Sequence, residues 1–196
     1  MRRGLIAVGI IIAFVAILTL SRHDIHSTTT TTTTKPPTTT TSTTSTTLAS
    51  ATCLANEFSG VYNEGEGAAG TIYASVTLTK TTAGTCTLKG WPILTLSDRL
   101  GAVLKSSGVD VPSAGSGFQF LTPTQANDAP TTLTLSMNSA TTFSLAYSDV
   151  QSGTTACESA VTVSVQFVTG GAAIPVTPLY AVQPCDGGQL WLSPFY

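Results

Sequence analysis

The chain has little charge and, beyond residue 26, no histidine. Charged side chains make up 9% of its 196 residues, against about a quarter in an average globular protein. Both histidines, His23 and His26, lie near the amino terminus. A Ser-His-Asp triad, a Cys-His pair or a histidine-ligated zinc site therefore cannot be built from the later residues alone. We expect no catalytic residue, no metal ligand and no cofactor.

Positive charge is scarce as well. From Cys53 onward, four basic side chains stand against nine acidic ones, which gives a net charge of −5. Binding to nucleic acid needs a basic surface that releases counterions from the phosphates. The composition therefore argues against a nucleic-acid partner.

Long apolar runs are also missing, except for one near the amino terminus. Arg2 and Arg3 precede a mainly apolar run of 17 residues, 4–20. This length is at the short end of what spans a bilayer, and the two arginines favour a cytoplasmic amino terminus. We predict that residues 1–27 anchor the chain in the cell membrane by a single transmembrane helix, with the rest outside. The alternative is secretion after cleavage of a signal peptide, but no small-residue cleavage site follows the run closely.

A threonine-rich stretch follows. Threonine occupies 15 of the 20 positions from 28 to 47, and the stretch contains no large apolar residue. Without apolar surface to bury, nothing offsets the entropy lost on folding. We expect residues 28–51 to form a disordered Thr/Pro-rich stalk, which is either O-glycosylated or a plain spacer.

Residues 52–196 alternate between apolar and small polar residues, the pattern of half-buried strands. The clearest runs are 71–79, 132–137, 142–147, 161–167 and 190–192, and shorter candidates are 93–97, 102–105, 118–121 and 179–182. Glycine, proline, asparagine and aspartate separate the runs. This pattern predicts one all-β domain, an antiparallel β-sandwich.

The four cysteines of the chain all fall in this domain, at Cys53, Cys86, Cys157 and Cys185. An even number on an exported chain predicts two disulfides. Three pairings are possible. We favour Cys53–Cys86 and Cys157–Cys185, because each closes a short sequential loop. A structural metal site is the rival interpretation, but no C-x-x-C spacing supports it.

A compact motif surrounds Cys86. It reads Thr-Cys-Thr-Leu-Lys-Gly-Trp-Pro over residues 85–92, with Asp98 and Gly101 downstream. Together with Cys53, residues 68–70, Cys185, Leu190, Leu192 and residues 194–195, it resembles the bacterial exported family called domain of unknown function 4232, found chiefly in actinobacterial envelope and secreted proteins. The resemblance implies an Ig-like sandwich and carries no catalytic residue.

Two positions depart from the family pattern, Lys80 for a usual asparagine and Thr124 for a usual glycine. The motif itself predicts a hairpin-like corner, in which Gly90 allows an unusual backbone conformation, Pro92 fixes the start of the next strand, and Asp98 with Gly101 forms a turn.

The aromatic residues near the end of the chain suggest a binding surface. By alternation, Trp191 points away from Leu190 and Leu192, and we expect it outside, near Phe195 and Tyr196. An exposed aromatic patch marks a candidate binding surface. The alternative is that a second layer or the carboxyl-terminal tail covers it.

Three further features have a functional and a structural interpretation. Residues 63–67 are either a calcium loop or, as we favour, a solvated acidic turn. Trp91 is either a carbohydrate platform or, as we favour, a packing residue. Asp98, Asp110 and Asp149 lie at predicted turns, and hydrolysis by paired carboxylates would need two of them to face each other.

These observations favour a non-catalytic binding or adhesion module at the bacterial cell envelope, which recognises an envelope polymer or a protein. The alternatives are a structural or stress-sensing envelope component and an exported enzyme that uses carboxylates.

Overall fold

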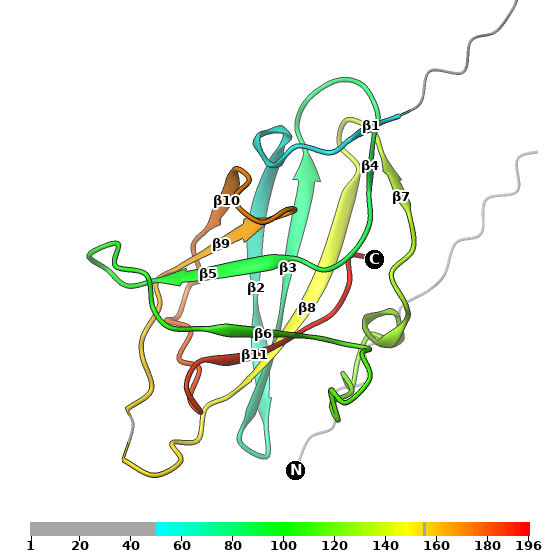
Figure 1. The fold of residues 1–196 in the computed structure, drawn as a ribbon. Helices are drawn as coiled ribbons and strands as arrows, with labels where there is room; N and C mark the ends of the chain where they lie inside the picture. Colours follow the sequence, from blue (N-terminus) through cyan, green and yellow to red (C-terminus); the bar gives the residue numbers. More distant parts are fainter. Residues whose placement is uncertain (1–49, 155) are drawn as a thin grey trace, which may run out of the picture. The chain divides into compact units, whose positions relative to one another are not determined.

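The computed structural model describes residues 50–154 and 156–196, and their long elements are all strands (Figure 1). Two short 3-10 turns span Ala55–Glu57 and Thr124–Asn127. The strands are β1 (Ala51–Thr52), β2 (Phe58–Ala68), β3 (Thr71–Lys80), β4 (Cys86–Leu88), β5 (Ile93–Ser97), β6 (Ser107–Asp110), β7 (Leu133–Leu135), β8 (Ala140–Ser148), β9 (Thr162–Gln166), β10 (Ala173–Val176) and β11 (Gln189–Leu192).

Nothing helical in these residues has the length and apolar character needed to cross a bilayer. The predicted membrane anchor and almost all of the predicted stalk lie outside the described residues.

The largest sheet has five strands in the order β2-β3-β8-β11-β6. At its centre, β3 and β8 are antiparallel, with Val76 opposite Phe143 and Ala74 opposite Leu145. Their apolar residues face one side, where Val76, Leu78, Phe143 and Leu145 are buried. Branched and aromatic side chains pack well across neighbouring strands. The strands predicted at 71–79 and 142–147 are therefore confirmed.

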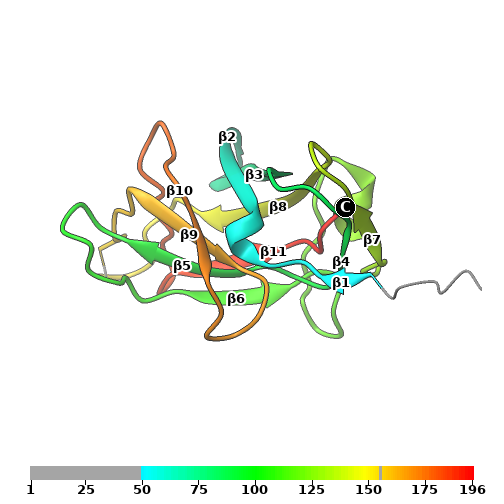
Figure 2. The ribbon, with the colours of Figure 1, turned by 90° about the horizontal axis from the view of Figure 1, so that it is seen from above.

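A three-stranded sheet in the order β10-β9-β5 lies against this apolar side. It contributes Leu96, Val163, Val165, Ile174 and Val176 to the main core, all of them buried. Figure 2 shows β5, β9 and β10 as a layer to one side of β2, β3 and β8. The described residues thus form an all-β, sandwich-like domain, as predicted. Burial of each such side chain contributes about 1.5–3 kcal/mol.

A small third sheet, in the order β1-β4-β7, stands at the point where the described chain begins. Its β1–β4 pair is parallel, and so is the β11–β6 pair of the large sheet. The prediction of a purely antiparallel sandwich is therefore wrong at these two pairs. Alternation sets which side a residue faces and carries no information on strand direction, so the sequence pattern contained no sign of them.

The motif around Cys86 forms a corner between two sheets. Strand β4 belongs to the small sheet and β5 to the three-stranded sheet. Gly90 between them has φ = 113°, a conformation that favours glycine. Beyond β5, the Asp98 carboxylate accepts hydrogen bonds from the backbone N–H groups of Leu100 and Ala102, both at 2.8 Å. The predicted turn at Asp98 is confirmed. It closes a short antiparallel pairing, in which the backbone N–H of Leu104 donates to the backbone oxygen of Leu96 at 2.9 Å, so the predicted hairpin-like corner is formed.

Three of the shorter predicted strands are not strands in the structure. Residues 118–121 and 179–182 are irregular apart from a single bridge at Val182, and 102–105 has a single bridge at Val103. Four observed strands, β1, β2, β4 and β10, lie outside the predicted runs, and β6 starts two residues beyond 102–105. Strand β2 contains three glycines, which hide its alternation.

Candidate binding site

The large sheet carries a second apolar cluster on the side opposite the main core, which we call the outer face. Cross-strand pairing places Tyr73 of β3, Ala146 of β8 and Trp191 of β11 in one row. Residues 111–128, the covering segment, pack over this row and contribute Val111, Phe118, Phe120 and Ala126. In Figure 1 this segment follows β6. The middle of the outer face is therefore covered by irregular chain rather than by another sheet.

Phe118 is the central residue of this cover. Its ring stacks on Trp191, with centroids 4.5 Å apart and planes 10° from parallel, and on Tyr73 at 6.0 Å and 27°. Since Tyr73 and Trp191 flank Ala146 in the row, the Phe118 ring fills the space between them. We call this space, bounded by Tyr73, Ala146 and Trp191, the aromatic slot.

The three aromatic residues expected on one exposed surface lie in different surroundings. Trp191 does point away from Leu190 and Leu192, which are in the main core, but it is half-buried under Phe118. Phe195 is 2% exposed and belongs to the main core, where its ring packs edge-on against Phe143 at 5.7 Å. Phe195 is therefore not part of an exposed surface.

Tyr196, the third of these residues, is half-buried and packs on the outer face with Trp191. The cover over these residues could not be anticipated, because the short alternating run at 118–121 predicted a strand, whereas the segment covers the face as a loop. The sequence left two possible covers for Trp191, a second layer and the carboxyl-terminal tail. In the structure a second layer covers Trp191, and this layer is a loop.

Beside the slot, a cleft of about 380 Å³ opens on the outer face. One wall is the tip of the β2–β3 hairpin, residues 64–68, and the other is residues 120–123 of the covering segment. Its remaining lining includes Tyr73, Ser75, Ser144 and Tyr196. We call it the hairpin cleft. Its volume falls within the range of about 300–1,000 Å³ that is usual for small-molecule sites.

A glycine shapes the hairpin wall of this cleft. The β2–β3 register shifts between Asn63 and Glu66, so that β2 bulges there. A Cβ on Gly65 would lie 1.6 Å from the backbone oxygen of Tyr73. No other residue can occupy this position without moving the backbone of β3. Bulges bend a strand and redirect its side chains. Residues 63–67 thus form the bulged part of strand β2, and the solvated acidic turn that we expected there is not formed.

Glu64 in the bulge and Glu66 directly after it have different roles. The Glu64 carboxylate accepts hydrogen bonds from the backbone N–H groups of Leu179 and Tyr180, which ties that loop to the hairpin. Glu66 lines the cleft and is exposed. Across residues 50–154 and 156–196, no three His, Cys, Asp or Glu side chains gather as a potential metal site. The observed partners of Glu64 therefore support the structural interpretation over a calcium loop.

Hydroxyl groups provide most of the remaining polar surface of the cleft. The Ser144 hydroxyl lies 2.8 Å from that of Tyr196. Burial raises the pKa of Tyr196, although the Ser144 hydrogen bond opposes the rise, so the phenol stays neutral at physiological pH. No lysine or arginine lines the cleft among the described residues. The cleft thus offers neutral hydroxyls, aromatic rings and carboxylate but no positive charge.

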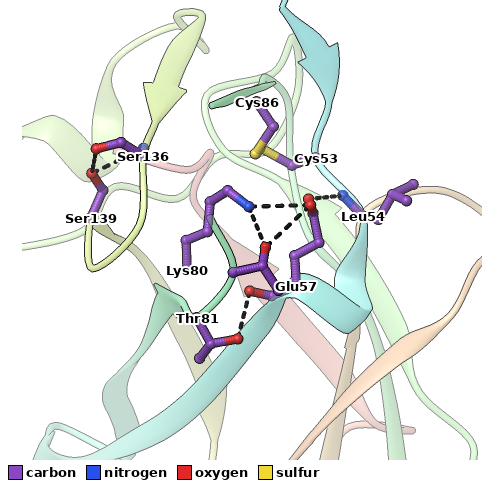
Figure 3. Close-up of a disulfide and its surroundings, with 9 residues drawn as sticks. Cys53, Leu54, Glu57, Lys80, Thr81, Cys86, Ser136 and Ser139 are labelled. Carbon is purple, nitrogen blue, oxygen red and sulfur yellow. Dashed lines mark hydrogen bonds and ion pairs between the residues drawn. A yellow bond between two sulfur atoms is a disulfide. The ribbon is translucent and has the colours of Figure 1, made fainter. Parts of the chain in front are cut away.

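A separate polar cluster lies beside the Cys53–Cys86 disulfide (Figure 3). Lys80 is only 1% exposed, and its ammonium group lies 3.2 Å from a carboxylate oxygen of Glu57 and 2.6 Å from the hydroxyl of Thr82. The backbone N–H of Leu54 also donates to the Glu57 carboxylate, at 3.1 Å. These bonds, the Leu54 bond first and Lys80 second, hold the pKa of Glu57 below its usual value. The charges of Lys80 and Glu57 are thus paired and hydrogen-bonded within the fold, which favours a structural role for the cluster.

Both favoured disulfides are present, Cys53–Cys86 and Cys157–Cys185. The pairing prediction is therefore confirmed. Stable disulfides form in oxidising compartments such as the bacterial exterior, so the two bridges indicate an exported domain.

Trp91 and the three aspartates considered above lie apart from the hairpin cleft. Trp91 is half-buried, and its indole N–H donates to the backbone oxygen of Val111 at 3.0 Å, which fixes the start of the covering segment. Asp98 caps its own turn. Asp110 ends the edge strand β6, where partial burial raises the pKa of its carboxyl. Asp149 lines a second depression of about 240 Å³ together with Tyr62 and Tyr147.

The sequence of this domain matches a protein-family model. The model described as "Domain of unknown function (DUF4232)" matches residues 53–196. The chain belongs to this family. The DUF4232 region begins at Cys53 and so contains both disulfides and the whole outer face. No curated protein and no solved structure matches the chain. Within the DUF4232 domain, Lys80 stands where the resemblance leads us to expect asparagine, and its ion pair with Glu57 compensates the buried charge.

Proposed function

We propose that this DUF4232 protein is a non-catalytic binding or adhesion module of the bacterial cell envelope, and that it binds through the hairpin cleft. The observation that carries the proposal is the cleft itself. It combines aromatic rings with hydroxyl groups and lies between two segments of irregular or bulged chain. Binding residues concentrate on such segments when a rigid sheet supports them.

The surrounding parts of the chain fit this role. A membrane anchor at residues 1–27 and a stalk at 28–51 would hold the domain outside the cell, at a distance from the bilayer. A fully extended stretch of 20 residues reaches on the order of 60 Å at about 3.1 Å per residue. An Ig-like sandwich is the form that we propose for the domain.

Catalysis has less support than binding. A hydrolase with paired carboxylates needs two acids on opposite sides of the scissile bond. The two acids of the hairpin cleft, Glu64 and Glu66, come from one strand, and Glu64 already accepts two backbone hydrogen bonds. We therefore place no catalytic residue in the cleft.

The binding function can be tested with one leucine substitution and its matched control. Leu121 lines the cleft and is 68% exposed, whereas Leu100 is 92% exposed in the distant Asp98 turn. The full chain, in nanodiscs, is mixed separately with purified peptidoglycan and with envelope proteins, and the bound fraction is measured by co-sedimentation. Leu121→Arg should reduce binding at least about tenfold, since a central interface residue can contribute more than 1.4 kcal/mol. Leu100→Arg should bind like the wild type. Equal effects of both substitutions would contradict the proposed site.

A structural or stress-sensing role is the second candidate, and it is favoured by the length of the threonine-rich stretch. Deletion of residues 28–47 separates the two roles. Binding in solution should survive the deletion if the cleft carries the function. A loss confined to whole cells would indicate that reach through the envelope matters.

A further inference from the structure

The aromatic slot is occupied by a ring from the chain itself. Phe118 lies nearly parallel to Trp191, with the Tyr73 ring on its other side and Ala146 in the row between them. The slot is thus one aromatic ring wide. Its shape fits the flat side chain of phenylalanine or tyrosine, for which offset stacking is a favoured arrangement.

Phe118 is held in place mainly by the contacts of its aromatic ring, and not by backbone hydrogen bonds. No backbone hydrogen bond joins residues 113–119 to a strand in the described part of the chain. Gly115 and Gly117 both have positive φ, and a Cβ added to either would meet no described atom within 4 Å, so the backbone there borders open space. By contrast, Phe120 is fixed by two hydrogen bonds with the Asn127 side chain, at 2.7 and 2.8 Å. Residues 113–119 can therefore move while both ends of the covering segment stay in place.

There is room for such a movement. A hollow of about 510 Å³ lies beside Phe118, lined by residues 111–113, 116–119 and Asn127 and by none of the residues of the hairpin cleft. Phe118 can leave the slot toward this hollow without disturbing the main core, to which it does not belong.

The tryptophan that bounds the slot has a polar group that Phe118 cannot satisfy. The indole N–H of Trp191 is buried and has no hydrogen-bond acceptor among the described residues. The other tryptophan, Trp91, has its indole N–H paired with Val111. A buried donor without a partner is uncommon and unfavourable. A ligand that brought both a ring and a carbonyl oxygen would complete the slot.

From these observations we infer that the slot binds an aromatic side chain of a partner polypeptide, with Phe118 as its internal substitute. The Phe118 ring moves out, the partner's phenylalanine or tyrosine stacks between Tyr73 and Trp191, and a neighbouring backbone carbonyl accepts from the Trp191 N–H. Tyr73 also lines the hairpin cleft, so the adjoining partner residues would lie in that cleft. The inference rests on the proposed binding function and names the class of partner.

The two indole N–H groups make the test direct. The full chain in detergent micelles gives one indole resonance for each of its two tryptophans, and loss of one resonance in Trp191→Phe assigns them. Phe118→Ala, which empties the slot, is titrated with N-acetyl-phenylalaninamide. We expect the Trp191 resonance to shift and the Trp91 resonance to stay. The apparent affinity should exceed that of the wild type at least about tenfold, because Phe118 competes for the slot in the wild type.

Three controls decide the outcome. N-acetyl-leucinamide should bind Phe118→Ala at least about tenfold more weakly, since it cannot stack. Phe118→Ala combined with Trp191→Leu lacks the Trp191 resonance, so its binding is read from the resonances of the amides themselves, which should show no binding of either amide. A trimer of N-acetylglucosamine should leave the resonance unchanged. Equal affinity for the two amides, or a shift with the sugar alone, would overturn the inference.

Phe118→Leu is the second variant, in case Phe118→Ala unfolds. Leucine keeps the apolar contact but stacks less, so the same order of affinities should appear with a smaller difference. This test is independent of the one at Leu121. Binding to envelope material without a response at Trp191 would remove only the aromatic-partner inference, whereas the reverse result would remove the proposed cleft.

Discussion

The two faces of the large sheet are built from the same strands but are covered in different ways. On the inner face, Val76, Leu78, Phe143 and Leu145 are fully buried beneath a second sheet. On the outer face, Tyr73 and Trp191 are half-buried beneath a loop that stacks one phenylalanine on them. A sheet gives a continuous, close-packed cover, whereas a loop gives a local one. Stability therefore resides mainly on the inner face, and the outer face is free to serve recognition.

The sharpest way to break this comparison is the same substitution on each face. Phe143→Ala removes a fully buried ring from the inner face and should lower the free energy of unfolding by about 3–5 kcal/mol. Phe118→Ala removes a half-buried ring from the outer face and should cost only about 1–2 kcal/mol. Urea unfolding followed by circular dichroism measures both values. Similar losses for the two variants would show that the faces contribute equally.

The disulfides separate covalent from packing contributions. Replacing Cys53 and Cys86 together by alanine should lower the free energy of unfolding by about 3–4 kcal/mol, because the open chain gains entropy when unfolded. The matched variant lacks Cys157 and Cys185 and should lose about the same, since the two sequence separations, 33 and 28 residues, are similar. A much larger loss for the first pair would mean that its position beside the main core matters beyond loop closure.

The smallest effect that we predict is the loss of stability in acid. It should come from the Glu57 carboxyl and not from the Tyr196 phenol on the outer face. The Glu57 carboxyl has a pKa below its usual value of 4.5 in the folded protein. The stabilisation it provides is therefore complete above pH 4.5 and is lost as the pH falls through the lower, folded-state pKa. On the outer face, burial raises the pKa of Tyr196, and its phenol does not titrate in this range.

Melting temperatures measured between pH 3 and 6 check this difference. Glu57→Gln should flatten the fall of the melting temperature below pH 4.5, and Glu158→Gln, at an exposed position, should keep the slope of the wild type. An unchanged slope in Glu57→Gln would show that the Glu57 bonds do not govern the response to acid.

Much of the inner face could be predicted from the sequence. The alternation in β3, β8 and β9 identified the buried residues, because one side of each strand meets the core. The disulfide pairing followed from loop length, and the Asp98 turn from local side-chain chemistry. Each of these properties depends on residues close together in the chain or on a single periodic pattern.

The outer face could not be predicted in this way. Trp191 was expected to point outward, and it does, but its cover comes from residues 111–128, where the short alternating run at 118–121 wrongly predicted a strand. The hairpin cleft depends on the bulge at Gly65, where the controlling contact is with the backbone of Tyr73. The cover over Trp191 comes from a segment distant in the sequence, and the Gly65 contact depends on the register of β2 against β3, so the alternation of apolar residues predicts neither.

The bridge between Cys53 and Cys86 has a mechanical consequence. It joins Cys53, the residue that follows β1, to Cys86 at the start of the neighbouring strand β4. Tension applied to the chain ahead of Ala51 passes through a sulfur–sulfur bond directly to Cys86. Residues 54–85, which include the β2–β3 hairpin, are bypassed and cannot be drawn out by that load. A pull from the predicted anchor, opposed by a load on residues beyond Cys86, would therefore leave the wall of the cleft in its shape.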